Sequence, residues 1–220
     1  MKYIFCAYRG WALKLYEKLS KKHKNMILIN CPEKLTFEKI NKIKPKYIFF
    51  PDWSWIISNE IIENFQCVCF HESNLPKFRG GSPIQNQIIR GIKKTKTTAF
   101  IMNEKLDAGK ILLQKNLSLT GSIDEIFSRM INNDFEMINK IIKNDFKLKT
   151  QKGKVTVFKR RNKKQSELKS LNHSKEFLYN FIRMLGDPYP NAFINIDKKK
   201  IIFKSANYNG KEITFQGVIK

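Results

Sequence analysis

The sequence predicts an α/β protein, with a mostly parallel sheet covered by helices on both faces and a small C-terminal α+β appendage. Three observations support this fold class. Short apolar runs alternate with helix-like segments in the first third of the chain, an amphipathic helix follows a capping motif at residue 122, and the pattern changes after residue 155. We expect one larger domain over residues 1–148 and a smaller one over residues 149–220.

The N-terminal region alternates between strands and helices. Apolar runs predict strands over residues 2–6, 26–30, 47–51 and 67–71, and apolar spacing predicts helices over residues 11–23, 37–43 and 56–65. Such crossover connections join parallel strands, so functional side chains are expected at the carboxyl ends of the strands.

The second half reads as a hairpin and a long helix. We predict a helix over residues 83–90, strands over 97–102 and 110–117, and a long helix ending near residue 143. Ser122 and Glu125 fit a capping box at the start of that helix. A polar linker is expected over residues 145–153, followed by short β segments around one helix at residues 175–185.

The net charge of +23 comes from 42 Lys and Arg against 19 Asp and Glu. Only seven of the basic residues are Arg, which nucleic-acid sites favour, and the lysines are spread along the chain. We therefore expect an anionic small substrate and disfavour a nucleic-acid partner.

The four cysteines lack the spacing of a zinc site, so we expect no metal and a reducing compartment. No apolar run approaches the roughly 18 residues of a membrane span, and the first residues do not resemble a signal peptide. A cytoplasmic protein without a membrane partner is predicted.

His71 and Asp107 are the candidate chemical pair. His71 ends a strand in the segment CFHESNLPKFRGGSPIQNQIIRG, residues 69–91, and Asp107 lies 36 positions later in a Leu-Asp-Ala-Gly loop. Taken alone, each residue is more often structural. Because both belong to the open edge of the predicted sheet, together they indicate an acid/base site.

These residues resemble a known family. The pattern H-x-S-x-L-P-x-x-R-G-x-x-P at residues 71–83, followed by L-D-x-G-x-I at residues 106–111, is similar to the formyltransferases, which include methionyl-tRNA, glycinamide ribonucleotide and sugar N-formyltransferases. The resemblance covers residues 1–145 and implies a Rossmann-like formyltransferase fold. It also implies transfer of a formyl group from 10-formyltetrahydrofolate to a primary amine, with no metal.

The resemblance also implies roles for the pair. A protonated His71 would stabilise the oxyanion, while Asp107 would keep the ring charged and accept the amine proton. The family normally carries Asn at the position of Cys69, and a thiol cannot replace an amide. We expect Asn74, a backbone N–H or a water to supply the missing donor; otherwise the chain is a slow or inactive relative.

Residues 50–57, 79–86 and 106–109, and the C-terminal residues 157–161, 181–185 and 188–193, most resemble sugar N-formyltransferases. Their subgroup formylates UDP-4-amino-4,6-dideoxy-N-acetyl-altrosamine, in a branch of pseudaminic acid and surface glycan biosynthesis. The predicted reaction is therefore formylation of the 4-amino group of a 4-amino-4,6-dideoxy sugar carried on UDP or dTDP.

Two sets of binding residues follow from this resemblance. A slot for the folate is expected from Trp53, Trp55, Ile57, Asn103, Glu104 and Leu106. Core packing is the alternative for the two tryptophans. Contacts with the nucleotide sugar are expected from Arg9, Gly10, Arg79, Gly80, Gly81, Ser82, Gln85 and Tyr189. Arg79 and Ser82 are the diphosphate candidates, since a helix N-terminus with small residues attracts anions.

Two alternatives stay open. A methionyl-tRNA formyltransferase-like enzyme fits the charge, but the chain after the long helix looks too short for a tRNA-binding barrel with its linker. A non-catalytic relative that binds a nucleotide or folate would make Cys69 a sign of lost chemistry. A homodimer through the C-terminal segment is expected by analogy alone.

Overall fold

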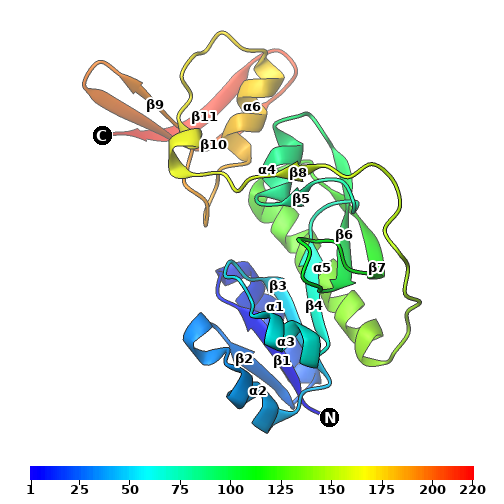
Figure 1. Ribbon diagram of the computed structural model, residues 1–220. Helices are drawn as coiled ribbons and strands as arrows, with labels where there is room; N and C mark the ends of the chain where they lie inside the picture. The colour runs from blue at the N-terminus through cyan, green and yellow to red at the C-terminus, as the bar shows by residue number, and fades with distance from the viewer.

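The computed structural model describes all residues from 1 to 220. A six-stranded sheet with the strand order β2-β1-β3-β4-β6-β7 forms its centre (Figure 1). Neighbouring strands from β2 to β4 pair in parallel, whereas β6 pairs antiparallel with both β4 and β7. The predicted fold class, a mostly parallel sheet with a small C-terminal appendage, is therefore confirmed.

The elements of this sheet follow the predicted order. Its strands are β1 (Tyr3–Ala7), β2 (Met26–Ile29), β3 (Tyr47–Asp52), β4 (Cys67–His71), β6 (Lys94–Ile101) and β7 (Ile111–Ser118). The helices of this part are α1 (Gly10–Lys22), α2 (Phe37–Ile43), α3 (Asn59–Asn64), α4 (Pro83–Ile88) and α5 (Ile123–Ile142). A single 3-10 turn, η1 (Pro32–Lys34), precedes α2.

Helices cover both faces of the sheet. α1 and α5 pack against each other and against one face, where 32 buried residues form the larger core cluster. α2 and α3 close a smaller cluster of nine buried residues on the other face. Along β4, Val68 and Phe70 enter the larger cluster and Cys67 the smaller one, so the alternation of the strand places Cys69 and His71 on the α2/α3 face.

Two helices are shorter than predicted. α3 begins at Asn59, after the N-cap Ser58, because residues 53–58 form an irregular segment in which Ile56 is fully exposed. α4 contains only six residues. In contrast, the capping box at Ser122 and Glu125 is present as predicted at the start of α5.

The polar segment after α5 is attached to the sheet. Ile111 and Lys149 exchange two backbone hydrogen bonds, of 2.8 and 2.9 Å, beside β7. The chain then runs along the outside of the molecule to β8 (Val157–Phe158), which pairs in parallel with the short β5 (Arg79–Gly80) (Figure 1). The expected domain boundary between residues 148 and 149 stays a prediction, because β8, which follows this boundary, pairs with β5, which precedes it.

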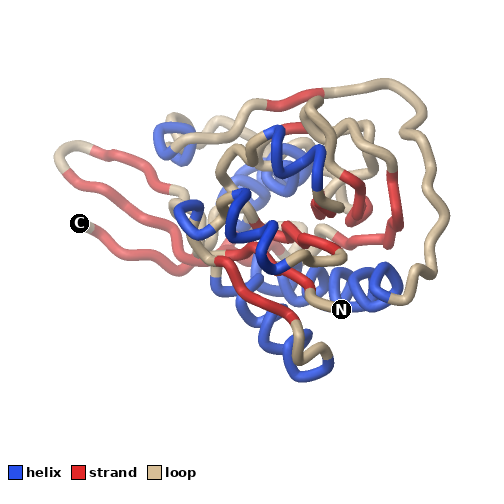
Figure 2. Tube along the Cα trace, turned by 60° about the horizontal axis from the view of Figure 1, so that its bottom comes forward, coloured by secondary structure: helices blue, strands red, loops and turns tan.

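The C-terminal part contains a three-stranded antiparallel sheet in the order β11-β10-β9. Its elements are η2 (Lys163–Ser166), α6 (Lys175–Arg183), β9 (Phe193–Ile196), β10 (Lys199–Tyr208) and β11 (Ile213–Ile219). This sheet projects from the end of the molecule that lies away from β1 and β2 (Figures 1 and 2). The buried Arg183 ties α6 to the first domain by donating hydrogen bonds to the carbonyls of Leu119 (2.7 Å) and Gly121 (2.9 Å).

No helix combines the length and the apolar character that crossing a membrane requires.

Candidate active site

The site is centred on His71 and Asp107, which the fold brings together as predicted. His71 is the last residue of β4, and Asp107 lies in the loop between β6 and β7. Their side chains are 7% and 14% exposed, with Nδ1 of the imidazole 3.7 Å from Oδ2 of the carboxylate. This distance is too long for a direct hydrogen bond and corresponds to an ion pair when the imidazole is protonated. The arrangement fits the predicted acid/base pair, whose catalytic role stays a proposal.

The imidazole of His71 is held by the turn that follows it. Nε2 donates a hydrogen bond of 2.6 Å to the backbone carbonyl of Phe78. Because a carbonyl oxygen only accepts, this nitrogen carries a proton. Nδ1 therefore remains the nitrogen that faces Asp107. The turn is itself braced by Ser73, whose hydroxyl donates to the carbonyl of Lys77 at 2.6 Å and whose carbonyl accepts from Thr98 Oγ1 at 2.6 Å.

Asp107 is oriented by its backbone and by two neighbours. Its φ of 49° lies in the left-handed region. The Oδ2 atom of Asp107 accepts a hydrogen bond of 2.7 Å from the N–H of Gly80. The backbone carbonyl of Asp107 accepts one of 2.8 Å from Gln151 Nε2. The Leu-Asp-Ala-Gly motif ends in glycine because a Cβ on Gly109 would lie 1.6 Å from the carbonyl oxygen of Ile101. The motif thus sets the position of the carboxylate through close backbone packing.

Asn74 is not brought to this pair. Its side chain is exposed, and its Oδ1 accepts a hydrogen bond of 3.3 Å from Gln114 Nε2. Cys69, at the position where the family carries Asn, keeps its proton, because burial and then the charges of Asp107 and Glu72 raise the pKa of its thiol well above the usual value. The Asn74 amide was expected to replace the donor that is missing at Cys69. In the structure this amide points away from the site and contacts Gln114.

Arg9, Gln85 and Tyr189, expected from the sequence to bind substrate, do come together near the carboxyl ends of β1 and β3. The Arg9 guanidinium forms an ion pair with Asp52 and lies 5.6 Å from the centroid of the Tyr189 ring. Gln85 is buried beside the Tyr189 hydroxyl, whose pKa burial raises to about 12. Gly10 begins α1 directly beside this group.

Sequence reasoning missed Asp52 and Glu72 in this region. Asp52 ends β3 and is 8% exposed, and burial raises the pKa of its carboxyl although Arg9 offsets part of the shift. Glu72 follows His71 directly and is 9% exposed. The available signal was the position of each acidic residue at the carboxyl end of a buried strand: Asp52 ends β3, and Glu72 follows the last residue of β4.

The turn expected to hold a diphosphate is filled by the protein itself. A Cβ on Gly81 would lie 2.3 Å from Cα of Arg160, so the small residues at 80 and 81 make room for β8 and the chain after it. Arg79 donates to Gln151 Oε1 at 2.7 Å, and Ser82 Oγ accepts the N–H of Arg161 at 3.1 Å. Close packing of residues 157–161 explains this motif without a ligand.

The residues expected to bind folate lie in three different surroundings: the core, an aromatic and apolar surface beside Asp107, and a separate pocket. Ile57 is buried in the smaller core cluster, whereas Trp55 is 40% exposed and packs against Tyr8 and Trp53, with ring centroids 4.6 and 4.9 Å apart. Trp53 Nε1 is buried without a partner. Leu106 is 62% exposed, which leaves an apolar side chain at the surface next to Asp107.

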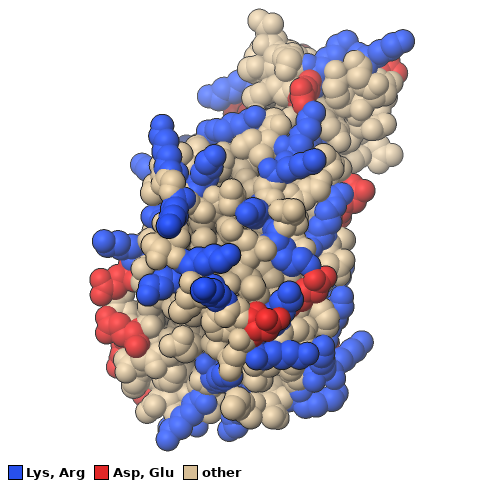
Figure 3. Space-filling model, turned by 90° about the vertical axis from the view of Figure 1, so that its right-hand side faces the viewer, with Lys and Arg blue, Asp and Glu red and all other residues tan.

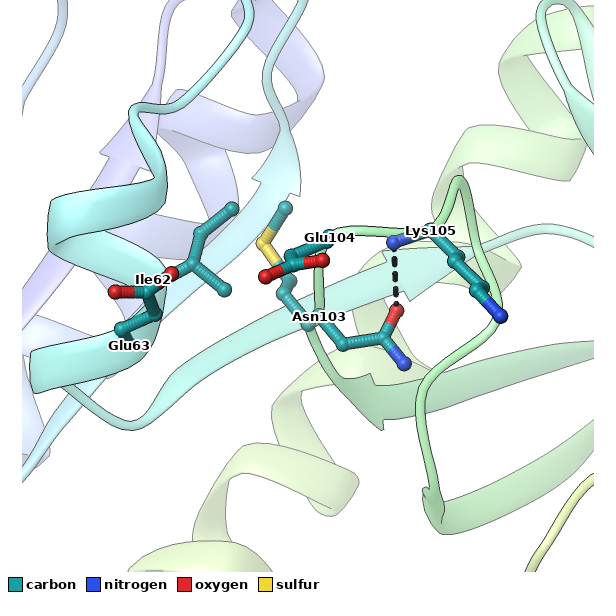
Figure 4. A pocket seen from close by; sticks show the side chains of 6 residues that line it. Ile62, Glu63, Asn103, Glu104 and Lys105 are labelled. Atoms are coloured by element: carbon teal, nitrogen blue, oxygen red, sulfur yellow. Dashed lines mark hydrogen bonds between the residues drawn. The ribbon is translucent and has the colours of Figure 1, made fainter.

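Asn103 and Glu104 belong to a pocket of about 380 Å³ between their loop and α3 (Figure 4). Its other lining residues are Ile62, Glu63, Met102 and Lys105. Asn103 Oδ1 accepts the backbone N–H of Lys105 at 3.2 Å, which stabilises the loop. The tryptophans do not line this pocket, so the expected single slot is divided into two neighbouring surfaces.

The comparisons with known proteins agree with this fold. Residues 23–139 match the family model described as formyl transferase, and residues 163–220 match the C-terminal domain of methionyl-tRNA formyltransferase. The chain therefore belongs to the formyltransferase family. This family uses 10-formyltetrahydrofolate, which confirms the predicted co-substrate.

Individual relatives point to one branch of the family. The methionyl-tRNA formyltransferases of Thermodesulfovibrio yellowstonii and Clostridium acetobutylicum are each 31% identical, over 78% and 87% of this chain and 59% and 66% of their own lengths. The chain thus spans between about half and two thirds of the curated relatives it matches. A solved structure named methionyl-tRNA formyltransferase from Clostridium thermocellum is 41% identical, with a TM-score of 0.95 over 100% of this chain and 99% of that one.

The expected sugar substrate is wrong. Sugar N-formyltransferases are represented by the Shewanella structure, which is 17% identical with a TM-score of 0.73 over 94% of this chain and 98% of that one, and shows the shared fold alone. The two curated relatives described above at 31% identity and the solved structure at 41% are named methionyl-tRNA formyltransferases. The prediction of a nucleotide-sugar partner is therefore wrong, and so is the prediction that a nucleic-acid partner is disfavoured. Residues 163–220 match the C-terminal domain of methionyl-tRNA formyltransferase, although the segment after the long helix was expected to be too short for such a domain.

Proposed function

We propose that this protein transfers the formyl group of 10-formyltetrahydrofolate to the α-amino group of methionyl-tRNA. The observation that carries this proposal is the 41% identity, over 99% of its length, to a solved structure named methionyl-tRNA formyltransferase. The match of residues 163–220 to the C-terminal domain of that enzyme class supports it independently. The acceptor is the proposed part, since formyl transfer follows from the family.

The surface charge suits a polyanionic acceptor. Lys and Arg side chains spread over the whole face shown in Figure 3, whereas Asp and Glu form a few small groups there. The segment that leads to the C-terminal part carries one acidic residue, Glu167, among the exposed basic residues Lys152, Lys154, Lys159, Arg160, Lys163, Lys164 and Lys169. Contacts between such residues and phosphates release counterions, so binding of tRNA would weaken as salt rises.

His71 and Asp107 would carry the chemistry. When 10-formyltetrahydrofolate is bound, it supplies the formyl group that the amine attacks. The positive charge of a protonated His71 would stabilise the carbonyl oxygen as negative charge develops there. Asp107, 3.7 Å from the ring, would stabilise the charged imidazole and receive a proton from the attacking nitrogen. Their low exposure limits competition from water.

The folate would lie along the exposed aromatic surface beside the pair. Trp53 has a buried indole N–H without a partner, and Trp55 and Leu106 expose apolar area at the same edge of the sheet. An aromatic pterin with hydrogen-bonding edges suits such a surface. The pocket lined by Asn103 and Glu104 would hold a more polar part of the same molecule. The expected homodimer and the cytoplasmic location both stay predictions.

An acceptor comparison tests the proposal. The purified protein is incubated with 10-formyltetrahydrofolate and, in separate reactions, methionyl-tRNA, free methionine and a nucleotide-linked amino sugar, and the products are analysed by mass spectrometry. We expect one added formyl mass on methionine recovered from the tRNA, and no product with His71→Asn. Formylation of the amino sugar alone would contradict the proposed acceptor while leaving formyl transfer intact.

A further inference from the structure

The strand β11 forms an open edge of the C-terminal sheet. It pairs with β10 on one side only, because it stands at the end of the strand order β11-β10-β9. The opposite edge is covered, since Leu168 N–H donates a hydrogen bond of 2.7 Å to the carbonyl of Phe193 in β9. Asn195 Nδ2 also donates to Glu167 Oε1 at 2.6 Å beside this strand. Because the sheet projects from the rest of the molecule (Figures 1 and 2), the outer side of β11 faces solvent.

The composition of β11 is unusual for an exposed edge strand. Its sequence, ITFQGVI, contains no charged residue and no proline, although Lys and Arg make up 42 of the 220 residues of the chain. Phe215, Val218 and Ile219 are 53%, 42% and 68% exposed, because α6 packs on β10 and leaves β11 uncovered. Proteins normally protect edge strands with a lysine, a proline or a bulge. β11 has none of these, so its edge is open to another strand and offers no cation to a phosphate.

The backbone of β11 shows which residues are available for pairing. Lys200 and Lys220 exchange two hydrogen bonds of 2.8 and 2.9 Å, and the carbonyl of Glu212 accepts from the N–H of Asn209 at 3.4 Å, so both ends of β11 direct these groups toward β10. The irregular residue in the pairing, Lys204, belongs to β10, so the alternation along β11 is uninterrupted. The residues that direct their N–H and C=O groups outward are therefore Ile213, Phe215, Gly217 and Ile219.

This outer edge is complementary to a second copy of itself. Two antiparallel β11 strands related by a two-fold axis at Gln216 place Ile213 opposite the partner's Ile219 and Phe215 opposite the partner's Gly217. All four pairs then join residues whose backbone groups point outward, which gives about eight new hydrogen bonds. The glycine has no side chain to obstruct the facing phenylalanine ring. Backbone direction and side-chain size therefore agree in one register.

The charges at the two ends of β11 support the same register. With the axis at Gln216, Glu212 faces the partner's Lys220, and symmetry repeats this pair at the other end of the interface. These positions are non-hydrogen-bonded pairs, in which the side chains of facing residues approach each other most closely. An axis at Phe215 would instead place Glu212 opposite the partner's Val218. Charge complementarity thus favours a second copy of this chain as the occupant of the edge.

We propose that two copies of this chain associate through β11, so that their two three-stranded sheets join into one continuous antiparallel sheet with Glu212 opposite the partner's Lys220. The assembly closes at two copies, because the β9 edge of each sheet is covered. The association is independent of the proposed acceptor. His71 and Asp107 both come from one chain, so each copy keeps a complete pair.

Sedimentation velocity between about 1 and 100 µM tests this interface. Wild type should form a dimer within this range. Glu212→Lys and Lys220→Glu should each raise the dissociation constant at least about fivefold, since both place like charges opposite each other at the two ends of the interface. The double variant, and an equimolar mixture of the two single variants, should return to the wild-type value because opposite charges face each other again. Lys198→Glu, in the exposed turn between β9 and β10, is the control with the same change of charge.

Ile219→Lys tests the apolar part of the edge. This 68% exposed residue should tolerate lysine without a change in urea unfolding, and the variant should stay monomeric at concentrations at which wild type is dimeric. Three results would overturn the proposal. These are a wild type that is monomeric throughout the range, a dimer that neither single charge reversal nor Ile219→Lys weakens, and a loss in the single variants that neither the double variant nor the mixture restores.

Discussion

His71 Nδ1 lies 3.7 Å from Asp107 Oδ2, although the two residues are 36 positions apart in the sequence. The strand β4 delivers the histidine, and the loop between β6 and β7 delivers the aspartate. Because Ile101 pairs with Val68 and Thr98 pairs with His71, this loop starts beside the amino end of β4 and returns toward His71. The turn after His71 holds both side chains. The carbonyl of Phe78 accepts a hydrogen bond from the His71 ring, and the N–H of Gly80 donates one to the Asp107 carboxylate. The pair is thus a product of sheet topology and of one turn.

Replacing either member of this pair should abolish most of the activity. We expect His71→Asn and Asp107→Asn each to lower kcat by at least about 10²-fold, since an oxyanion donor or a general base is lost. The double variant should be little worse than the singles, because the two residues act as a unit. Single-turnover kinetics, with folding checked by circular dichroism, would measure this. Additive losses would show that the residues act separately.

Asn74 should contribute little to catalysis. Its exposed amide is bonded to Gln114 and not to the catalytic pair. We expect Asn74→Ala to change kcat by less than about threefold, compared with the 10²- to 10³-fold loss typical of an oxyanion donor. Steady-state assays at saturating folate would distinguish the two. A large loss would place the amide in the site during turnover.

Gly109 should tolerate no side chain. The Cβ of Gly109→Ala would meet the carbonyl oxygen of Ile101 at 1.6 Å, so the β6–β7 loop must move. We expect the free energy of unfolding to fall by about 2 kcal/mol or more. Urea denaturation would measure it, with Gly10→Ala, whose Cβ meets no atom within 4 Å, as the control. Equal stability of the two variants would refute the packing argument.

Asp134 should cost stability at neutral and alkaline pH. Burial raises the pKa of its carboxyl well above the usual value, so the folded state binds a proton that the unfolded state has released. Its contribution to stability is therefore most favourable below the unfolded pKa of about 3.9 and diminishes as pH rises toward the folded pKa. We expect Asp134→Leu to stabilise the protein by about 1–3 kcal/mol at pH 8.

The Asp134→Leu gain should shrink as the pH falls toward 4, where both states of the wild-type residue approach neutrality. Urea unfolding at pH 4, 6 and 8 would follow this trend, with Asp124→Asn at the exposed start of α5 as the comparison. A gain that is independent of pH would mean that packing, and not the buried charge, controls the effect.

Local patterns predicted most elements correctly. The bounds of β4 and α2 coincide with the predicted ranges, because apolar runs and helical spacing are strong over those residues. α3 is shorter than predicted, since the segment before it exposes Ile56 completely and follows no helical pattern. The expected sugar acceptor was wrong because the short motifs around His71 and Asp107 are shared by formyltransferases with different acceptors.

The sequence by itself predicted a mostly parallel sheet and the pairing of His71 with Asp107, because apolar runs and turn motifs are encoded locally. The formyl donor followed from the resemblance of those motifs to the formyltransferases. Only the tertiary structure decided which polar side chains meet. It joined Arg9, Asp52 and Glu72 from three separate strand ends, filled the turn at Gly81 with residues 157–161, and directed Asn74 toward Gln114. Such contacts depend on side chains distant in sequence, whose pairing follows from the packing of the whole chain and leaves no local signal.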